Sequence, residues 1–288
     1  MLEMILNPRN HDRGPIKMFF VGLLYASLSL LLVHWFFGND PTLSRASGMI
    51  VITFCIMFSL PYMYYLFKQE EEETELVEGF FHVWRVHKDA IFAFMWLFVG
   101  FVVAFAFWNL MLQNPNLLNF QIETYCQINE PGNVINCVDK HAFITGDVIS
   151  MTGQASSKMN RFLGILENNV YVMIFTLIFS LVFGAGAIFI LAWNASVIAA
   201  AIGIFTKNQI AGIPLGLGRY MIHGFPEIAA YFVTALAGGI FGAGVLRNGI
   251  RNRRFIRILE NSFLLLFLSI IILVIAAAME VYLTPLLF

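Results

Sequence analysis

The chain alternates between long apolar runs and short polar connections, which is the pattern of a multi-pass membrane protein. Seven apolar segments cover residues 18–37, 48–67, 90–112, 170–192, 195–206, 225–246 and 260–283. A helix needs about 20 apolar residues to cross the hydrocarbon core, so the segment 195–206 is short and the other segments are long enough. The pattern therefore predicts an all-α integral membrane protein with about seven membrane-crossing helices, one of them short or broken.

The first long polar stretch, residues 68–89, begins with an acidic run. Leu76, Phe80 and Trp84 recur there every four residues, which is helical spacing on one face. We expect an interfacial helix that lies on the inner membrane surface with Trp84 in the interface. A helix that docks a partner protein is the alternative.

The second long polar stretch, residues 113–167, is predicted to be an outer polar loop. It contains Cys126 and Cys137, which can form a disulfide if the loop lies outside the cell or can remain two free thiols. On this division the chain is a single membrane domain. Residues 1–112 hold the N-terminal spans, and residues 168–288 hold the C-terminal spans.

The basic residues indicate the orientation, because Lys and Arg favour the cytoplasmic side. Arg9, Arg13 and Lys17 precede the first span, and five Arg residues occur within 247–257. Both groups lie inside only if an even number of crossings separates them, so the short segment 195–206 must count as a crossing. We therefore expect a protein of the cell membrane with a cytoplasmic N-terminus and an external C-terminus.

Composition agrees with this class and excludes others. Hydrophobic residues make up 59% of the 288 residues and charged residues only 12%, about half the share of a soluble domain. The net charge of −1 argues against a nucleic-acid partner. No metal-ligand cluster, nucleophile motif or phosphate-binding loop is apparent, so we expect no metal, no cofactor and no catalytic residues.

The candidate polar site lies in the C-terminal third. His223 and Glu227 are four residues apart between apolar segments, and a carboxylate at membrane depth costs roughly 3 kcal/mol on insertion scales. Pro226 suits the first turn of a helix, so Glu227 is expected to lie at a helix start, where free N–H groups favour a negative charge. The alternative is a functional polar site that uses His223 and Glu227.

Other polar and small residues of this third have structural interpretations. Asn168 and Asn169 precede an apolar run and are expected to cap its helix, whereas Asn194 interrupts a long apolar run. The Gly- and Pro-rich residues 207–222 predict a broken or re-entrant segment. Small residues that let helices approach closely are Gly184, Gly186, Gly238, Gly239 and Gly242, which serve either packing within the chain or a homodimer seam.

These residues form an ordered set. It comprises Glu167-Asn168-Asn169, an aromatic apolar helix, Gly184-Ala185-Gly186, Trp193-Asn194-Ala195, His223-Gly224-x-x-Glu227 and the Gly-rich run 238–244. The set resembles the stage II sporulation protein M family of prokaryotic multi-pass membrane proteins, most closely over about residues 160–249. The family usually has Asn-Gly where this chain has Asn194-Ala195, and Pro-His-Gly where it has Ile222-His223-Gly224.

The resemblance implies a function. The founding member of that family is a membrane scaffold that holds cell-wall hydrolases during engulfment in spore-forming bacteria. By resemblance we expect a non-enzymatic scaffold in the lipid bilayer that organises protein partners. The alternative function is a small-solute or ion transporter or channel that uses the polar site at His223 and Glu227.

Overall fold

The computed structural model is an assembly of helices. It describes residues 14–38, 40, 42–74, 80–114, 116–129, 132–142, 158–183, 187–207, 209–248 and 253–287. In chain order the elements are α2 (Pro15–Phe37), η1 (Leu43–Ala46), α3 (Ser47–Thr74), α4 (Phe80–Leu112), α5 (Asn119–Asn129), α6 (Val134–Ala142), α7 (Lys158–Phe183), α8 (Ala187–Phe205), η2 (Ile210–Gly212), α9 (Ile213–Asn248), α10 (Arg253–Ala278), η3 (Met279–Leu283) and α11 (Thr284–Leu287). Seven of the described helices are long and apolar enough to cross a membrane, which confirms the predicted fold class and number of crossings.

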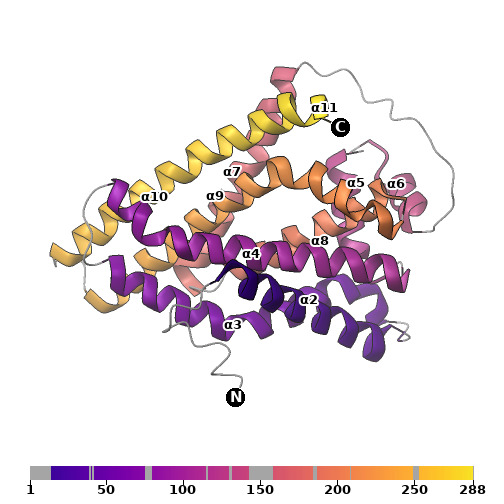
Figure 1. Cartoon of the computed structure of the whole chain (residues 1–288), viewed down its shortest axis with the longest axis horizontal. Coiled ribbons are helices and arrows are strands. Elements are labelled where there is room, and N and C mark those ends of the chain that lie inside the picture. The colour runs from indigo at the N-terminus through magenta and orange to yellow at the C-terminus, as the bar shows by residue number, and fades with distance from the viewer. Residues whose placement is uncertain are drawn as a thin grey trace.

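Two spans occupy the centre of the assembly. In Figure 1, α4 lies between the pair α2–α3 and the helix α9. In the most apolar 18 residues of each span, 72% of the residues are buried in both α4 and α9, but only 17% in α7 and 33% in α10. Phe94 of α4 stacks on Phe232 of α9 with ring centroids 4.3 Å apart, which joins the two halves of the chain. The outer helices α7 and α10 therefore present most of their apolar side chains to lipid or to a partner.

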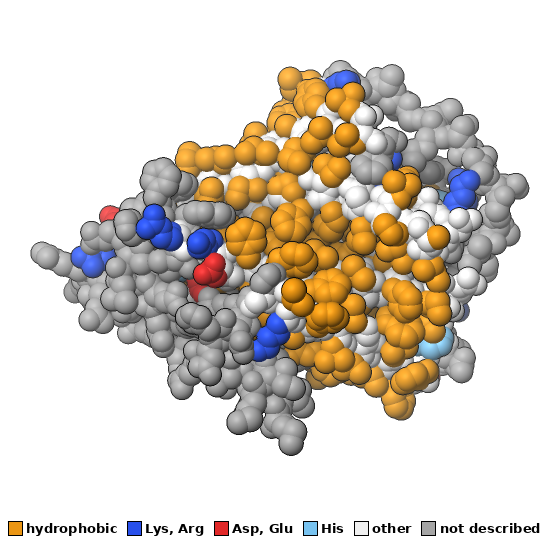
Figure 2. Space-filling model, viewed as in Figure 1, with side chains coloured by type: hydrophobic (Ala, Val, Ile, Leu, Met, Phe, Trp, Pro, Cys, Tyr) orange, Lys and Arg blue, Asp and Glu red, His pale blue; other side chains and the backbone are white. Residues whose placement is uncertain are grey.

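An apolar surface surrounds these spans. Figure 2 shows hydrophobic side chains in a broad area across the middle of one face, with Lys and Arg side chains at its margins. Exposed residues of α10 such as Phe263 and Phe267, 62% and 60% exposed, belong to the spans. This distribution is the one expected for a protein whose solvent at mid-depth is hydrocarbon.

Glycines set the closest helix contacts. A Cβ atom at Gly22 of α2 would overlap the carbonyl group of Leu97 in α4, and one at Gly100 of α4 would overlap that of Phe19 in α2. In the second half, a Cβ at Gly242 of α9 would lie 2.5 Å from the carbonyl oxygen of Leu181 in α7. Gly238 faces α7 in the same way, and Gly239 is buried. Gly238 and Gly242 therefore pack within the chain, whereas Gly184 and Gly186 lie outside the described residues.

The boundary between the fourth and fifth spans differs from the prediction. Residues 170–192 and 195–206 were expected to be separated at Trp193-Asn194, but α8 runs through that position from Ala187 to Phe205. The Asn194 amide donates a 2.8 Å hydrogen bond to the carbonyl of Ile190 on its own helix, so the polar side chain does not end the helix. At 19 residues α8 is about 28 Å long, which is close to the hydrocarbon thickness. The expected bounds 195–206 are therefore wrong, although this span, with 18 residues, is the shortest of the seven candidates.

The Gly- and Pro-rich residues 207–222 are also more regular than expected. Most of them belong to α9, which is 36 residues and about 54 Å long, with Pro226 inside it. Pro214 lies in the first turn, where a missing N–H costs nothing, and Gly216 lets the helix approach Ile202. The predicted re-entrant segment is therefore the start of a long span.

The two polar stretches contain helices. Residues 68–74 continue α3 and residues 80–89 begin α4, while residues 75–79 lie outside the described part. The expected single surface helix over 68–89 is thus wrong; the long spans extend beyond their apolar segments instead. The expected outer loop 113–167 contains α5 and α6 and the first turns of α7, so helical structure replaces much of that loop.

Candidate functional site

The predicted residues His223 and Glu227 lie on one face of α9, together with Tyr231 one turn further on. The Tyr231 hydroxyl donates a 2.9 Å hydrogen bond to Glu227 Oε1. His223 Nδ1 lies 3.1 Å from Thr284 Oγ1 at the start of α11. The Thr284 hydroxyl donates its single hydrogen to the Met279 carbonyl, 3.2 Å away, so it accepts from His223 and the imidazole carries a proton on Nδ1. His223 and Glu227 therefore have separate partners and do not form an ion pair.

Glu227 is not at a helix start. Pro226 and Glu227 both lie inside α9, more than three turns after its first residue. The backbone N–H groups near Glu227 are consequently used within the helix, and the predicted capping role is wrong. The carboxylate is half-buried among side chains of three helices and must be stabilised by those side chains.

A second carboxylate lies near the first. Glu280 is in η3, a π-helix that links α10 to α11 and contacts α9, and it is close enough to Glu227 to interact electrostatically. The antiparallel packing of α9 and α10 brings the end of the last span beside Glu227. Short π-helices occur often at functional sites.

Asn169 completes this group from α7. It is only 3% exposed, its side chain faces the Glu227 carboxylate, and its Nδ2 atom has no hydrogen bond of normal geometry. The exposed Asn168 lies beside it, with its Nδ2 3.4 Å from Asn169 Oδ1. Both residues lie in the interior of α7, so neither caps a helix as predicted. Asn194 of α8 is bonded to its own helix and is not brought into the group.

Two arginines lie on the side where α7 and α9 begin. Arg161 acts electrostatically on Glu280, and Arg219 acts on His223. On α7, Arg161 precedes Asn169 by eight residues, and on α9, Arg219 precedes Glu227 by eight residues. Eight residues correspond to about 12 Å along a helix axis. The guanidinium of Arg219 also lies 5.0 Å from the centre of the Phe205 ring. We call Arg161 and Arg219 the arginine margin. We call the acidic group further along these helices the carboxylate cluster; it consists of Asn169, Glu227, Tyr231 and Glu280.

A separate carboxylate–imidazole pair joins α3 and α4. His87 Nδ1 lies 2.6 Å from Glu70 Oε2, and both side chains are 0% exposed. Sequence analysis missed this pair because the two residues are 17 positions apart and lie in a stretch expected to be one surface helix.

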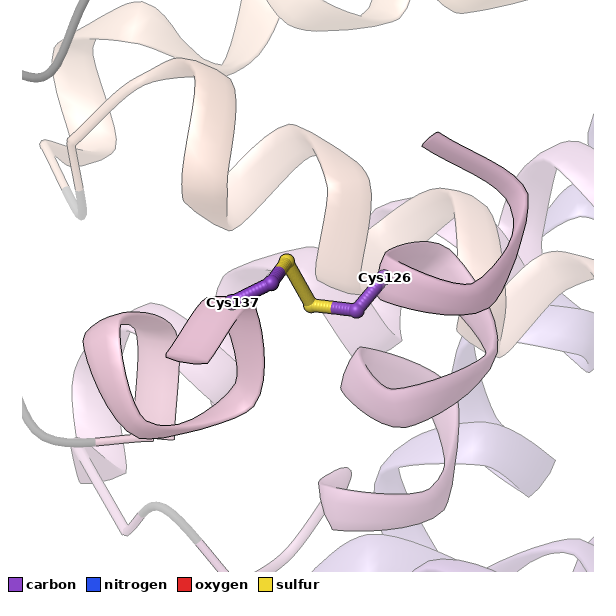
Figure 3. The surroundings of a disulfide bond; sticks show 2 residues. All are labelled: Cys126 and Cys137. Atoms are coloured by element: carbon purple, nitrogen blue, oxygen red, sulfur yellow. A yellow bond between two sulfur atoms is a disulfide. The ribbon is translucent and has the colours of Figure 1, made fainter. Parts of the chain in front are cut away.

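Outside the spans, α5 and α6 form a hairpin that is closed by a disulfide. Cys126 of α5 and Cys137 of α6 are bonded, and their side chains are 0% and 1% exposed (Figure 3). Of the two alternatives left open by the sequence, the structure contains the disulfide. Among the described residues there is no group of three or more His, Cys, Asp or Glu side chains that could hold a metal ion.

The comparison with known families decides the relationship. The family model described as stage II sporulation protein M matches residues 90–285, which is more than half of the chain. The chain belongs to the stage II sporulation protein M family. No curated protein and no solved structure matches the chain.

The residues that match the family model include the carboxylate cluster but not the Glu70–His87 pair. In this member of the stage II sporulation protein M family the matched region includes the whole carboxylate cluster, the arginine margin and the disulfide hairpin. It excludes α2 and α3, and with them Glu70. The carboxylate cluster and the hairpin are therefore the features to consider when the family relationship is translated into function.

Proposed function

We propose that this stage II sporulation protein M family member is a non-enzymatic membrane scaffold that holds partner proteins through its α5–α6 hairpin. The observation that carries the proposal is the exposure of Ile128 and Ile135, 62% and 78%, on the only disulfide-closed element of the described chain. Neither residue belongs to a candidate span. An exposed apolar pair outside the spans suits a protein contact, and the disulfide lowers the entropy that ordering the hairpin would cost on binding.

The packing of the spans supports a scaffold over a solute pathway. A small, partly open pocket of about 10 Å³ lies between α7, α8 and α9 in the described chain, lined by Thr176, Ile190, Leu191, Ile228, Tyr231 and Phe232. Such a volume is at the lower limit for one water molecule. A transporter needs a chamber for its solute, so this arrangement gives the transporter alternative little support.

The proposed orientation has a cytoplasmic N-terminus and an external C-terminus, from the positive-inside rule. With seven crossings it places the hairpin outside, where disulfides persist. Gly132→Cys should then react with a membrane-impermeant thiol reagent in intact cells, and Asn252→Cys only after permeabilisation. The native thiols do not interfere, because Cys126 and Cys137 are bonded and Cys55 is buried. Labelling of both positions from one side would contradict the orientation.

The scaffold proposal is tested by partner retention. The full chain is crosslinked in native membranes, purified and analysed by mass spectrometry, as wild type and as the double variant Ile128→Ser/Ile135→Ser. We expect discrete partners with wild type and at least a tenfold loss in the variant, the size of effect typical of contact residues. Asp139→Ser is the matched control, because Asp139 is polar and exposed on the same hairpin. Equal recovery of partners by both variants would contradict the hairpin as the docking element.

A further inference from the structure

The carboxylate cluster contains more negative charge than its surroundings neutralise. Glu227 and Glu280 lie within one polar group between α7, α9 and the π-helix η3. A single ionised carboxylate at membrane depth already costs several kcal/mol, and a like charge nearby disfavours ionisation of both. Arg161 acts on Glu280 from the margin, but no cation of the described chain lies within 4 Å of either carboxylate. The group therefore needs a positive charge that the described side chains do not supply.

An independent feature shows that the group is incomplete. Asn169 is 97% buried, and its amide nitrogen approaches the Glu227 carboxylate without reaching a hydrogen bond of normal geometry. An unsatisfied buried donor destabilises the fold, so such positions require an explanation. A half-turn of the amide exchanges its nitrogen and oxygen, which lets Asn169 present either a donor or an acceptor to an occupant.

The atoms of the group define the chemistry of the occupant. The two carboxylates, the Tyr231 phenol and the Asn169 amide offer oxygen atoms, which are the ligands of small hard cations and the acceptors of a shared proton. The imidazole of His223 is bonded to Thr284 and points its Nδ1 proton away from the carboxylates. A divalent transition metal would want nitrogen or sulfur ligands as well, and these are absent from the described group.

We propose that Glu227 and Glu280 together bind one small monovalent cation, a proton or an alkali-metal ion, in a site completed by Asn169 and Tyr231. The charged and titratable groups around the site are Arg161 from α7, Arg219 and His223 from α9, and Glu280 itself from η3. The two carboxylates come from α9 and from η3 at the end of the last span, so the bound cation links these two elements. The proposal is independent of the scaffold function, because it concerns the spans and not the hairpin.

The test compares the melting temperature of the full chain in lipid nanodiscs under two titrations. The first lowers the pH in choline chloride, and the second adds NaCl or KCl at fixed mildly basic pH. A bound cation stabilises the folded state by mass action, so the melting temperature of wild type should rise in one of the two titrations. A response to pH alone identifies a proton, and a response to NaCl or KCl identifies an alkali-metal ion.

Glu227→Gln and Glu280→Gln are the decisive variants. The amide copies the shape of a neutral carboxylic acid, so each variant should lose the response and melt, without the cation, as high as loaded wild type. Glu260→Gln is the matched control, because Glu260 is exposed on α10 and should keep the wild-type response. A wild-type response that persists in both Gln variants would overturn the proposal. So would the absence of any wild-type response, whatever the stability of the variants.

Infrared difference spectroscopy separates a bound proton from a general effect of pH on the fold. A carboxylic acid has a C=O stretch that a carboxylate lacks. For the proton case we expect this band on acidification of wild type and its loss in Glu227→Gln or Glu280→Gln. An unchanged band in both variants would assign the protonation to other carboxyl groups and overturn the proton case.

Discussion

Two regions of this protein bring carboxylate and imidazole side chains below the surface, and they do so in opposite ways. Glu70 and His87 meet directly at 2.6 Å, with both side chains fully buried between α3 and α4. Glu227 and His223 share one helix, yet Glu227 accepts from Tyr231 and His223 bonds to Thr284. The first region is a closed pair, whereas the second is an open group with a second carboxylate and an unsatisfied amide.

The difference shows that closeness in sequence does not determine pairing. Side chains four residues apart on a helix can meet, but here each meets a different neighbouring element. The closed pair is built by two consecutive helices and lies outside the family match, since both Glu70 and His87 precede residue 90. The open group needs α7, α9 and η3 and lies within the match. A pair that satisfies itself suits a structural role, and an open group suits binding.

The largest expected effect comes from breaking the closed pair. His87→Ala leaves the Glu70 carboxylate buried without its imidazole, and removal of one partner of a buried ion pair costs about 3–5 kcal/mol of folding stability. Glu227→Gln, by contrast, should cost nothing. The measurement is the melting temperature of each variant in detergent.

The double variant Glu70→Leu/His87→Leu serves as the control for the closed pair. It removes both polar groups, and such replacements are often neutral, so it should be more stable than His87→Ala. A loss in His87→Ala no greater than that in Glu227→Gln would erase the distinction between a closed and an open region.

Removal of the disulfide in the α5–α6 hairpin should have the next largest effect on stability. The Cys126–Cys137 bond closes a sequence separation of 11 residues, and its removal should destabilise the hairpin by about 2–3 kcal/mol in the chain-entropy model. Hydrogen exchange of α5 and α6 in Cys126→Ser/Cys137→Ser should rise, with the exchange of α4 unchanged. Mass spectrometry of the non-reduced wild type should show the bond. Two alkylatable thiols in fresh protein would contradict it.

The open group should depend on the contact between α7 and α9, and the closed pair should not. Gly242→Ala places a methyl group 2.5 Å from the Leu181 carbonyl oxygen, and such overpacking typically costs about 1–3 kcal/mol. We expect α7 to move and Asn169 to shift from Glu227, which would weaken the cation response proposed above. Hydrogen exchange around Glu70 and His87 should stay unchanged.

Gly224→Ala is the matched control on the same helix. Its added methyl group would meet Ile198 and Met221 at 3.7 Å, an ordinary contact. It should therefore keep both stability and the cation response. An equal loss in the two glycine variants would mean that any added methyl group on α9 disturbs the site, and that the contact with α7 is not the cause.

The apolar pattern predicted an all-α membrane protein with seven crossings, and the resemblance of the ordered motifs predicted the family. The sequence also selected Asn169, His223 and Glu227, because polar residues at membrane depth are conspicuous. It failed where a local rule was applied to a single residue. Asn194 was expected to interrupt a helix and Pro226 to start one, yet helix-internal hydrogen bonding accommodates the former, and α9 extends through the latter.

Contacts between distant segments could not be predicted from one sequence. Glu280 approaches Glu227 only because α10 packs antiparallel to α9 and ends in a π-helix. Gly22 and Gly100 are single glycines on α2 and α4, so no repeated small-residue motif in the sequence predicts the close contact between these two helices. Glu70 and His87 likewise meet only because α3 and α4 pack against each other. Pairing of this kind is a property of the packing, and the spacing within one helix does not contain it.

A third carboxylate, Asp40, is exposed to solvent and extends the comparison to the surface. Its substitution is expected to have the smallest effect on stability. Asp40 lies between the first two spans, where its Oδ1 accepts 2.8 Å hydrogen bonds from the backbone N–H groups of Leu43 and Thr42. The N–H of Leu43 and then that of Thr42 hold the pKa of Asp40 below its ordinary value. A lowered folded-state pKa means that the carboxylate stabilises the fold above the unfolded-state pKa and that this contribution disappears as the pH falls through the folded-state value.

Asp40→Ala should therefore lower the melting temperature slightly at neutral pH, and the difference from wild type should vanish in strongly acidic buffer. The effect should be smaller than that of His87→Ala or Gly242→Ala, because water solvates the exposed carboxylate in both states. Asp40→Asn keeps an acceptor oxygen without the charge, so its difference from wild type should be intermediate at neutral pH. A difference between Asp40→Ala and wild type that stays constant with pH would show that the turn needs the side chain's shape and not its charge. In that case charge would matter for stability only where the carboxylate is buried, as at Glu70 and Glu227.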